Sequence, residues 1–161
     1  MLSEEFVDVA LRLLAAVGAG MAIGLNRDIK GKPTGMRTLG LVSLGAALVS
    51  IVMVHHADMQ QHPDALSRVL QGIIQGVMTG IGFIGAGVIL RDHKEKEVEG
   101  LTTAACVWVT AALGIACALA AWSIVLLGAG LALAILTLGR PVERVLSRLF
   151  APSSKEPSGD S

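Results

Sequence analysis

The stretch GLTTAACVWVTAALGIACALAAWSIVLLGAGLALAILTLG, residues 100–139, contains forty consecutive residues without a charged side chain. A continuous helix of that length would be about 60 Å long, twice the roughly 30 Å of hydrocarbon in a bilayer. The stretch must therefore fold back and supply two membrane helices. We place the reversal near residues 118–123, with Trp122 at the membrane interface, where tryptophan side chains are enriched.

Three more apolar runs precede this stretch. They cover residues 13–25, extended by a turn that carries Asp8 and Arg12, then residues 38–54 and residues 69–90. Each approaches the length of about 20 residues that a membrane helix needs. The composition agrees, because 53% of the chain is hydrophobic and only 16% is charged, against about 25% in soluble proteins. The sequence predicts an all-α polytopic membrane protein with five transmembrane helices.

The basic residues are distributed unevenly among the segments between these helices. Residues 26–37 carry four lysines and arginines, residues 55–68 one, residues 91–99 three, the turn near 118–123 none and residues 140–161 four. This alternation predicts that the N-terminus lies outside and the C-terminus in the cytoplasm. Beyond the transmembrane domain of residues 1–139, we expect a short amphipathic helix at 140–150 on the cytoplasmic face and a disordered tail at 151–161.

Residues 80–87, GIGFIGAG, satisfy the glycine pattern of a dinucleotide-binding loop. That pattern needs a strand before it, whereas VLQGIIQGVMT, residues 69–79, is typical of a membrane helix. We therefore expect no dinucleotide, and the net charge of zero gives no indication of a nucleic-acid partner. Without a nucleophile paired with a base or a strong set of metal ligands, the sequence predicts no catalytic residue, metal or cofactor.

Small residues recur at four-residue spacing and favour close contact between membrane helices. The alternative is a broken third helix whose backbone lines a cavity. Polar residues form two stripes that could meet inside the bundle: Gln71, Gln75 and Thr79 on the third helix, and Thr102, Cys106 and Thr110 on the fourth. The predicted packing glycines are Gly20, Gly24, Gly72, Gly76, Gly80, Gly82, Gly85 and Gly87.

Ionised residues occur near the ends of the predicted helices. Asp8 and Arg12 are four residues apart and can form an ion pair, which we interpret as an interfacial anchor, with a functional pair as the alternative. The histidines and aspartates of residues 55–64 are interpreted as a solvated loop rather than a metal site. Because the central parts of the spans lack Asp and Glu, a cation path would need an oligomeric pore lined by glutamine, threonine and backbone carbonyls.

Three ordered blocks of the sequence resemble the MgtC/SapB family of bacterial inner-membrane proteins. They are GLNRDIKGKPTGMRTLGLVSLGAAL (residues 24–48), GIGFIGAGVILR (80–91) and VEGLTTAACVWVTAALGIACA (98–118). The resemblance covers most of residues 7–135, and the chain looks like a short member without the added soluble C-terminal domain. The motif positions outside the glycines already given are Arg27, Asp28, Lys32, Pro33, Gly35, Arg37, Thr38, Gly100, Leu101, Thr102, Thr103 and Ala104.

This resemblance implies a non-enzymatic protein of the inner membrane that takes part in magnesium homeostasis, and in survival inside host cells in pathogens. It implies a regulator of another membrane complex, for example the F-type ATP synthase. The alternative hypothesis is an oligomeric transporter or channel for a divalent cation such as Mg²⁺. The expected partners are the lipid bilayer and either further copies of the chain or another membrane complex. One departure is Asn26, where relatives usually show glutamate, so a role that needs two carboxylates there is in doubt.

Overall fold

The computed structural model describes residues 2–54, 63–90 and 100–150. Within these ranges the chain forms the five helices α1 (Leu2–Ile29), α2 (Met36–Val54), α4 (Pro63–Leu90), α5 (Leu101–Ala118) and α6 (Trp122–Phe150). Each of these helices is long and apolar enough to cross a membrane. The prediction of an all-α, five-span membrane protein is therefore confirmed.

The predicted reversal inside residues 100–139 lies between α5 and α6. Ala120 adopts a left-handed conformation with φ of 53°, and the amides of Ala120 and Ala121 donate to the carbonyls of Cys117 and Ala116. This pair of bonds is the arrangement with which a glycine usually ends a helix. Because an alanine takes the left-handed position here, the sequence carries no glycine or proline to mark the turn.

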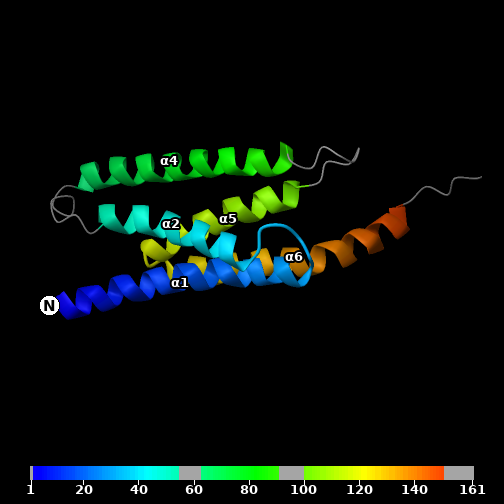
Figure 1. Ribbon diagram of the computed structural model, residues 1–161, viewed down its shortest axis with the longest axis horizontal. Coiled ribbons are helices and arrows are strands. Elements are labelled where there is room, and N and C mark those ends of the chain that lie inside the picture. Colours follow the sequence, from blue (N-terminus) through cyan, green and yellow to red (C-terminus); the bar gives the residue numbers. More distant parts are fainter. Residues whose placement is uncertain (1, 55–62, 91–99, 151–161) are drawn as a thin grey trace, which may run out of the picture.

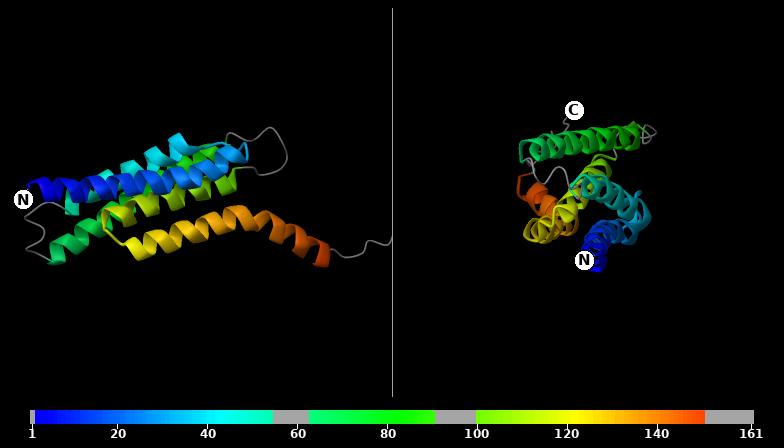
Figure 2. Two further views of the ribbon diagram at one scale, coloured as in Figure 1. Left: turned by 90° about the horizontal axis from the view of Figure 1, so that it is seen from below. Right: turned by 90° about the vertical axis from the view of Figure 1, so that its left-hand side faces the viewer.

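The helices run alternately up and down along one long axis, and α5 lies in the middle (Figure 1). Helix α5 contacts each of the other four helices, whereas α4 contacts only α5 and α2 in the described part of the chain. Figure 2 shows α4 at one edge of the bundle with α5 between it and α1. The core accordingly sits on α5, where Val107, Ala111 and Cys117 are fully buried.

Helices α1, α2 and α5 approach one another through glycines. A Cβ atom added at Gly20 would meet the Leu39 carbonyl, and one added at Gly114 would meet the Ser43 carbonyl. In lipid the hydrophobic effect does not drive helices together, so van der Waals contact between closely approaching backbones takes its place. The contact of α1 with α2 and α5 fixes the end of the bundle where the predicted linker residues lie.

Helix α6 continues through Pro141 to Phe150, so the predicted boundary at residues 139 and 140 is not a helix end. Figure 2 shows that α6 changes direction in its last part, as expected when proline removes a backbone hydrogen bond. Val142, Val145 and Leu146 are exposed on this part. That it lies along the membrane surface stays a prediction. The predicted histidine cluster at residues 55–62, the loop at 91–99 and the tail at 151–161 lie outside the described residues.

Candidate functional site

The linker between α1 and α2 is a closed turn built by the sequence KGKPTG, residues 30–35. Gly31 has φ of 59°, and the amides of Gly31 and Lys32 donate to the carbonyls of Asp28 and Arg27 at 3.0 Å each. These two bonds complete the C-terminal cap of α1, in which glycine is the residue that tolerates the left-handed position. Pro33 follows directly and cannot continue the helix.

Asp28 connects the end of α1 to the start of α2. Its Oδ2 atom accepts a hydrogen bond of 2.9 Å from the backbone amide of Met36, the first residue of α2. A carboxylate at a helix N-terminus pairs with an amide that has no partner inside the helix and with the positive end of the helix dipole. A Cβ atom at Gly35 would overlap the Asp28 carboxylate, so a larger residue there would displace the carboxylate from this position.

Arg27 is an almost fully buried cation, with 5% of its surface exposed. Its Nη2 atom donates to the hydroxyl of Thr103 on α5 and to the carbonyl of Pro33 in the linker. Its Nε atom is buried and has no hydrogen-bond partner among the described residues. Arg27 and Thr103, which are 76 residues apart in the sequence, are thus joined at one end of the bundle. We call this end the basic end.

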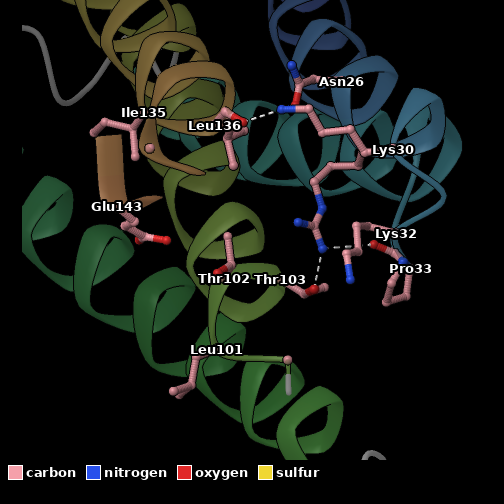
Figure 3. Close-up of a pocket in the computed structure, with 13 residues that line it drawn as sticks. Asn26, Lys30, Lys32, Pro33, Leu101, Thr102, Thr103, Ile135, Leu136 and Glu143 are labelled. Atoms are coloured by element: carbon pink, nitrogen blue, oxygen red, sulfur yellow. Dashed lines mark hydrogen bonds between the residues drawn. The ribbon is translucent and has the colours of Figure 1, made fainter. Parts of the chain in front are cut away.

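A pocket of about 420 Å³ opens at the basic end between α1, α5 and α6. Figure 3 shows Lys32 and Pro33 on one side, Glu143 on the other, and Thr102 and Thr103 between them. The Lys30 ammonium donates to the Leu136 carbonyl and so joins α1 to α6. The pocket is lined by Asn26, Arg27, Lys30, Lys32, Pro33, Gly100, Leu101, Thr102, Thr103, Ile135, Leu136, Gly139 and Glu143.

Most of the predicted motif residues divide into three groups. The residues that line the pocket are Arg27, Lys32, Pro33, Gly100, Leu101, Thr102 and Thr103. Asp28 and Gly35 shape the linker behind it, as described above. Arg37 and Thr38 are exposed on the first turn of α2 and are not among the residues that line the pocket.

Sequence reasoning missed the contribution of α6 to this pocket. Glu143 and Leu136 belong to α6, and only the fold brings them beside Lys30 and Arg27. A signal was present for Glu143, because it is an acid among the basic residues of 140–150. No pattern in the sequence indicated which loop these residues approach.

Helix α4 is continuous through all of its glycines, so the broken-helix alternative does not describe this structure. It packs on the core through Val77, Met78 and Ile81, and a Cβ atom added at Gly85 would lie 3.4 Å from the Ala104 side chain. The side chains of Gln71, Gln75 and Thr79 are exposed. Beside the remaining glycines a Cβ atom would meet no described atom within 4 Å; these are Gly72, Gly76, Gly80, Gly82 and Gly87.

The two polar stripes lie on different surfaces and do not meet inside the bundle. Cys106 and Thr110 are buried in the core, and Thr102 lies at the pocket, whereas Gln75 and Thr79 point away from α5. The reason is the helical repeat: Val77 and Ile81 face α5, and Gln75 and Thr79 lie about 160° to 200° round the helix from Val77.

Asp8 and Arg12 form the predicted ion pair, with 2.7 Å between Oδ2 and Nη2. The Nη1 atom of Arg12 also donates to the Ala118 carbonyl, the last residue of α5, at 2.8 Å. A cation at the C-terminal end of a helix pairs with carbonyls that have no partner inside that helix. The pair thus holds α1 against the end of α5, far from the basic end.

Comparisons with known proteins identify what this chain is similar to. The family model described as "MgtC family" matches residues 13–145. SrpB of Synechococcus elongatus is 43% identical over 130 residues, covering 77% of this chain and 70% of that protein. The Escherichia coli K12 protein named putative magnesium transporter YhiD is 41% identical, covering 70% of this chain. MgtC of Salmonella typhimurium LT2 is 39% identical, covering 68% of this chain.

The chain spans only about half of several of these relatives, namely 50% of YhiD and 42% of MgtC. No solved structure matches it.

Proposed function

Because this chain belongs to the MgtC family, we propose that it is a non-enzymatic inner-membrane protein that contributes to magnesium homeostasis by regulating another membrane complex. Two relatives support the link to magnesium through their names, MgtC and putative magnesium transporter YhiD. In this proposal the basic end faces the cytoplasm and the N-terminus faces outward. The F-type ATP synthase is a candidate for the regulated complex.

The exposed face of α4 is the surface through which we propose that the chain contacts the regulated complex. Here Gln71, Gln75 and Thr79 lie beside a row of glycines at which an added Cβ atom would meet no described atom of another helix within 4 Å. In hydrocarbon, amide side chains gain from hydrogen bonds to another helix, and glycines let a second backbone approach closely. A face with both properties suits association with a membrane helix from outside the chain, either of a further copy or of another complex.

A second candidate is a Mg²⁺ transporter, the alternative that the sequence left open. Two buried hydroxyls favour it, because Ser43 Oγ on α2 and Thr110 Oγ1 on α5 have no hydrogen-bond partner in the described part of the chain. Polar atoms at membrane depth can line a route for water or ions. In the described residues no group of three or more His, Cys, Asp or Glu could hold a metal ion.

A photo-crosslinking residue in place of Gln75 tests the first candidate in native membranes. The matched control places the same residue at Leu126 of α6, which is 75% exposed. The proposal expects protein crosslinks from position 75 and none from 126, with an ATP synthase subunit as one product that mass spectrometry would identify.

Liposomes that contain the purified chain and a magnesium-sensitive dye test the second candidate. The regulatory proposal expects no protein-dependent Mg²⁺ flux. Flux that disappears in Thr110→Val, together with no crosslink from position 75, would replace the regulator by the transporter.

A further inference from the structure

The pocket at the basic end concentrates positive charge around a cavity. Its lining includes the three cations Arg27, Lys30 and Lys32 and one carboxylate, Glu143. At about 420 Å³, the cavity falls within the range of small-molecule sites, about 300 to 1,000 Å³. None of its lining residues belongs to α4, so its ligand is a separate question from the proposed association.

Arg27 is a buried cation that an anionic ligand would stabilise. Its side chain is buried, and the partners it has are neutral oxygens of Thr103 and Pro33. Its Nε atom has no partner among the described residues. The salt bridge between Asp8 and Arg12 lies at the opposite end of the bundle. A buried guanidinium that faces only neutral groups is costly, and an anion in the pocket would remove that cost.

The N-terminus of α5 lies at the same pocket and also favours an anionic ligand. Gly100, which precedes α5, has φ of 100° and provides no side-chain cap. The amides of the first turn of an 18-residue helix therefore have no capping side chain, and the positive end of the helix dipole lies at the pocket. Amides of this kind bind phosphate oxygens in many proteins. Thr102 and Thr103 add hydroxyl groups at the same place.

We propose that this pocket binds a phosphate group. Arg27 supplies planar donors, Lys32 supplies charge at the rim, and the α5 N-terminus supplies amides, which together match the oxygens of a phosphate mono- or diester. Two apolar side chains that line the pocket, Leu101 and Ile135, are 57% and 70% exposed and extend the wall toward lipid. A lipid headgroup and a free phosphate share the chemistry that the pocket recognises.

The test uses the full chain purified in a maltoside detergent, which contains no phosphate. One arm adds phosphatidylglycerol to the micelles and measures bound lipid by native mass spectrometry, with an uncharged glycolipid as the comparison. The other arm titrates inorganic phosphate by calorimetry. We expect binding in at least one arm, and the arm that responds identifies the source of the phosphate.

Four variants locate the binding. Lys32→Gln and Arg27→Gln should weaken it by about tenfold, because each removes a charged donor from the pocket. Glu143→Gln should strengthen it a few-fold by removing a negative charge from the lining. Arg37→Gln is the matched control, since Arg37 lies at the same end but is exposed and does not line the pocket.

The result that overturns the proposal is binding in neither arm, or an equal loss in Arg37→Gln and Lys32→Gln, which would mean attraction by overall charge. Should Arg27→Gln fail to fold, Lys32→Gln and Glu143→Gln still decide the question, because they change in opposite directions. An affinity for phosphatidylglycerol no higher than for the uncharged glycolipid would exclude the lipid arm.

Discussion

The glycines of α1 and those of α4 share a four-residue spacing but have different surroundings. Beside Gly20 and Gly24, an added Cβ atom would meet the backbone of α2. Beside Gly72, Gly76 and Gly80, it would meet no described atom within 4 Å. The same sequence pattern therefore serves two purposes. In α1 it lets the chain pack on itself, and in α4 it leaves a surface that no described part of the chain covers.

The helices α1, α2 and α5 are also held in place by different interactions from those that hold α4. Helices α1, α2 and α5 are connected by close backbone contact, by Asp28 at the start of α2 and by Arg12 at the end of α5. Helix α4 rests on α5 and α2 through apolar side chains such as Val77 and Ile81. Substitutions in the first region should change folding, and substitutions on the outer face of α4 should not.

The largest effect is expected from Gly24→Val. A valine would meet the backbone of Met36 and Gly35, which cannot move without disturbing the linker. Overpacking typically costs about 1 to 3 kcal/mol, and contact with backbone atoms places the expected loss near the upper end of that range. The free energy of unfolding, measured by steric trapping in bicelles, checks this value. Gly80→Val on α4 is the control and should change it by less than about 1 kcal/mol. Equal losses in the two variants would remove the distinction between the helices.

A smaller loss is expected from Arg12→Leu. The change removes the donor to the Ala118 carbonyl and the partner of Asp8, and a charged hydrogen bond of this kind contributes about 1.5 to 3 kcal/mol. Partial exposure of Asp8 places the expected cost near the lower end of that range. Arg68→Leu on the exposed start of α4 is the control, with an expected change within about 0.5 kcal/mol. A loss in Arg68→Leu as large as in Arg12→Leu would contradict the contrast.

A loss of about 1 kcal/mol is expected from Asp28→Ala, which removes the acceptor for the Met36 amide at the start of α2. Asp28→Asn keeps an oxygen that can accept this bond and should recover most of the stability. The corresponding acid of α4 is Asp64, in its first turn, and Asp64→Ala should cost only a few tenths of a kcal/mol. Thermal unfolding followed by circular dichroism in detergent ranks the three variants.

The sequence predicted the helices well because charge and length alone limit what can cross a bilayer. Forty uncharged residues had to make two helices, and the reversal was placed within residues 118–123, where Leu119–Ala121 now connect α5 to α6. The pocket was predicted only in part. Arg27, Lys32 and Thr103 were named from motifs, but Glu143 and Leu136 reach the pocket through the packing of α6, which no local pattern encodes.

The two polar stripes show why the contacts between helices were harder to predict than the membrane spans. A four-residue period says that Gln71, Gln75 and Thr79 share one face, but not which neighbour that face meets. The apolar positions Val77 and Ile81 decided the orientation by packing on α5. In a membrane both faces of a helix border apolar surroundings, so hydrophobicity does not distinguish the inner face from the outer one.

The smallest effect on folding is expected from Gly76→Ala, and it tests what covers the outer face of α4. An added methyl group there meets no described atom within 4 Å, and alanine is the better helix former by about 1 kcal/mol, so the free energy of unfolding should stay the same or rise. Association through this face needs close backbone approach, so crosslinking from position 75 should fall. Gly130→Ala on α6, also with open space beside it, is the matched control and should leave crosslinking unchanged. If Gly76→Ala keeps full crosslinking while Gly76→Leu abolishes it, the partner contacts α4 through side chains rather than through a backbone that approaches these glycines.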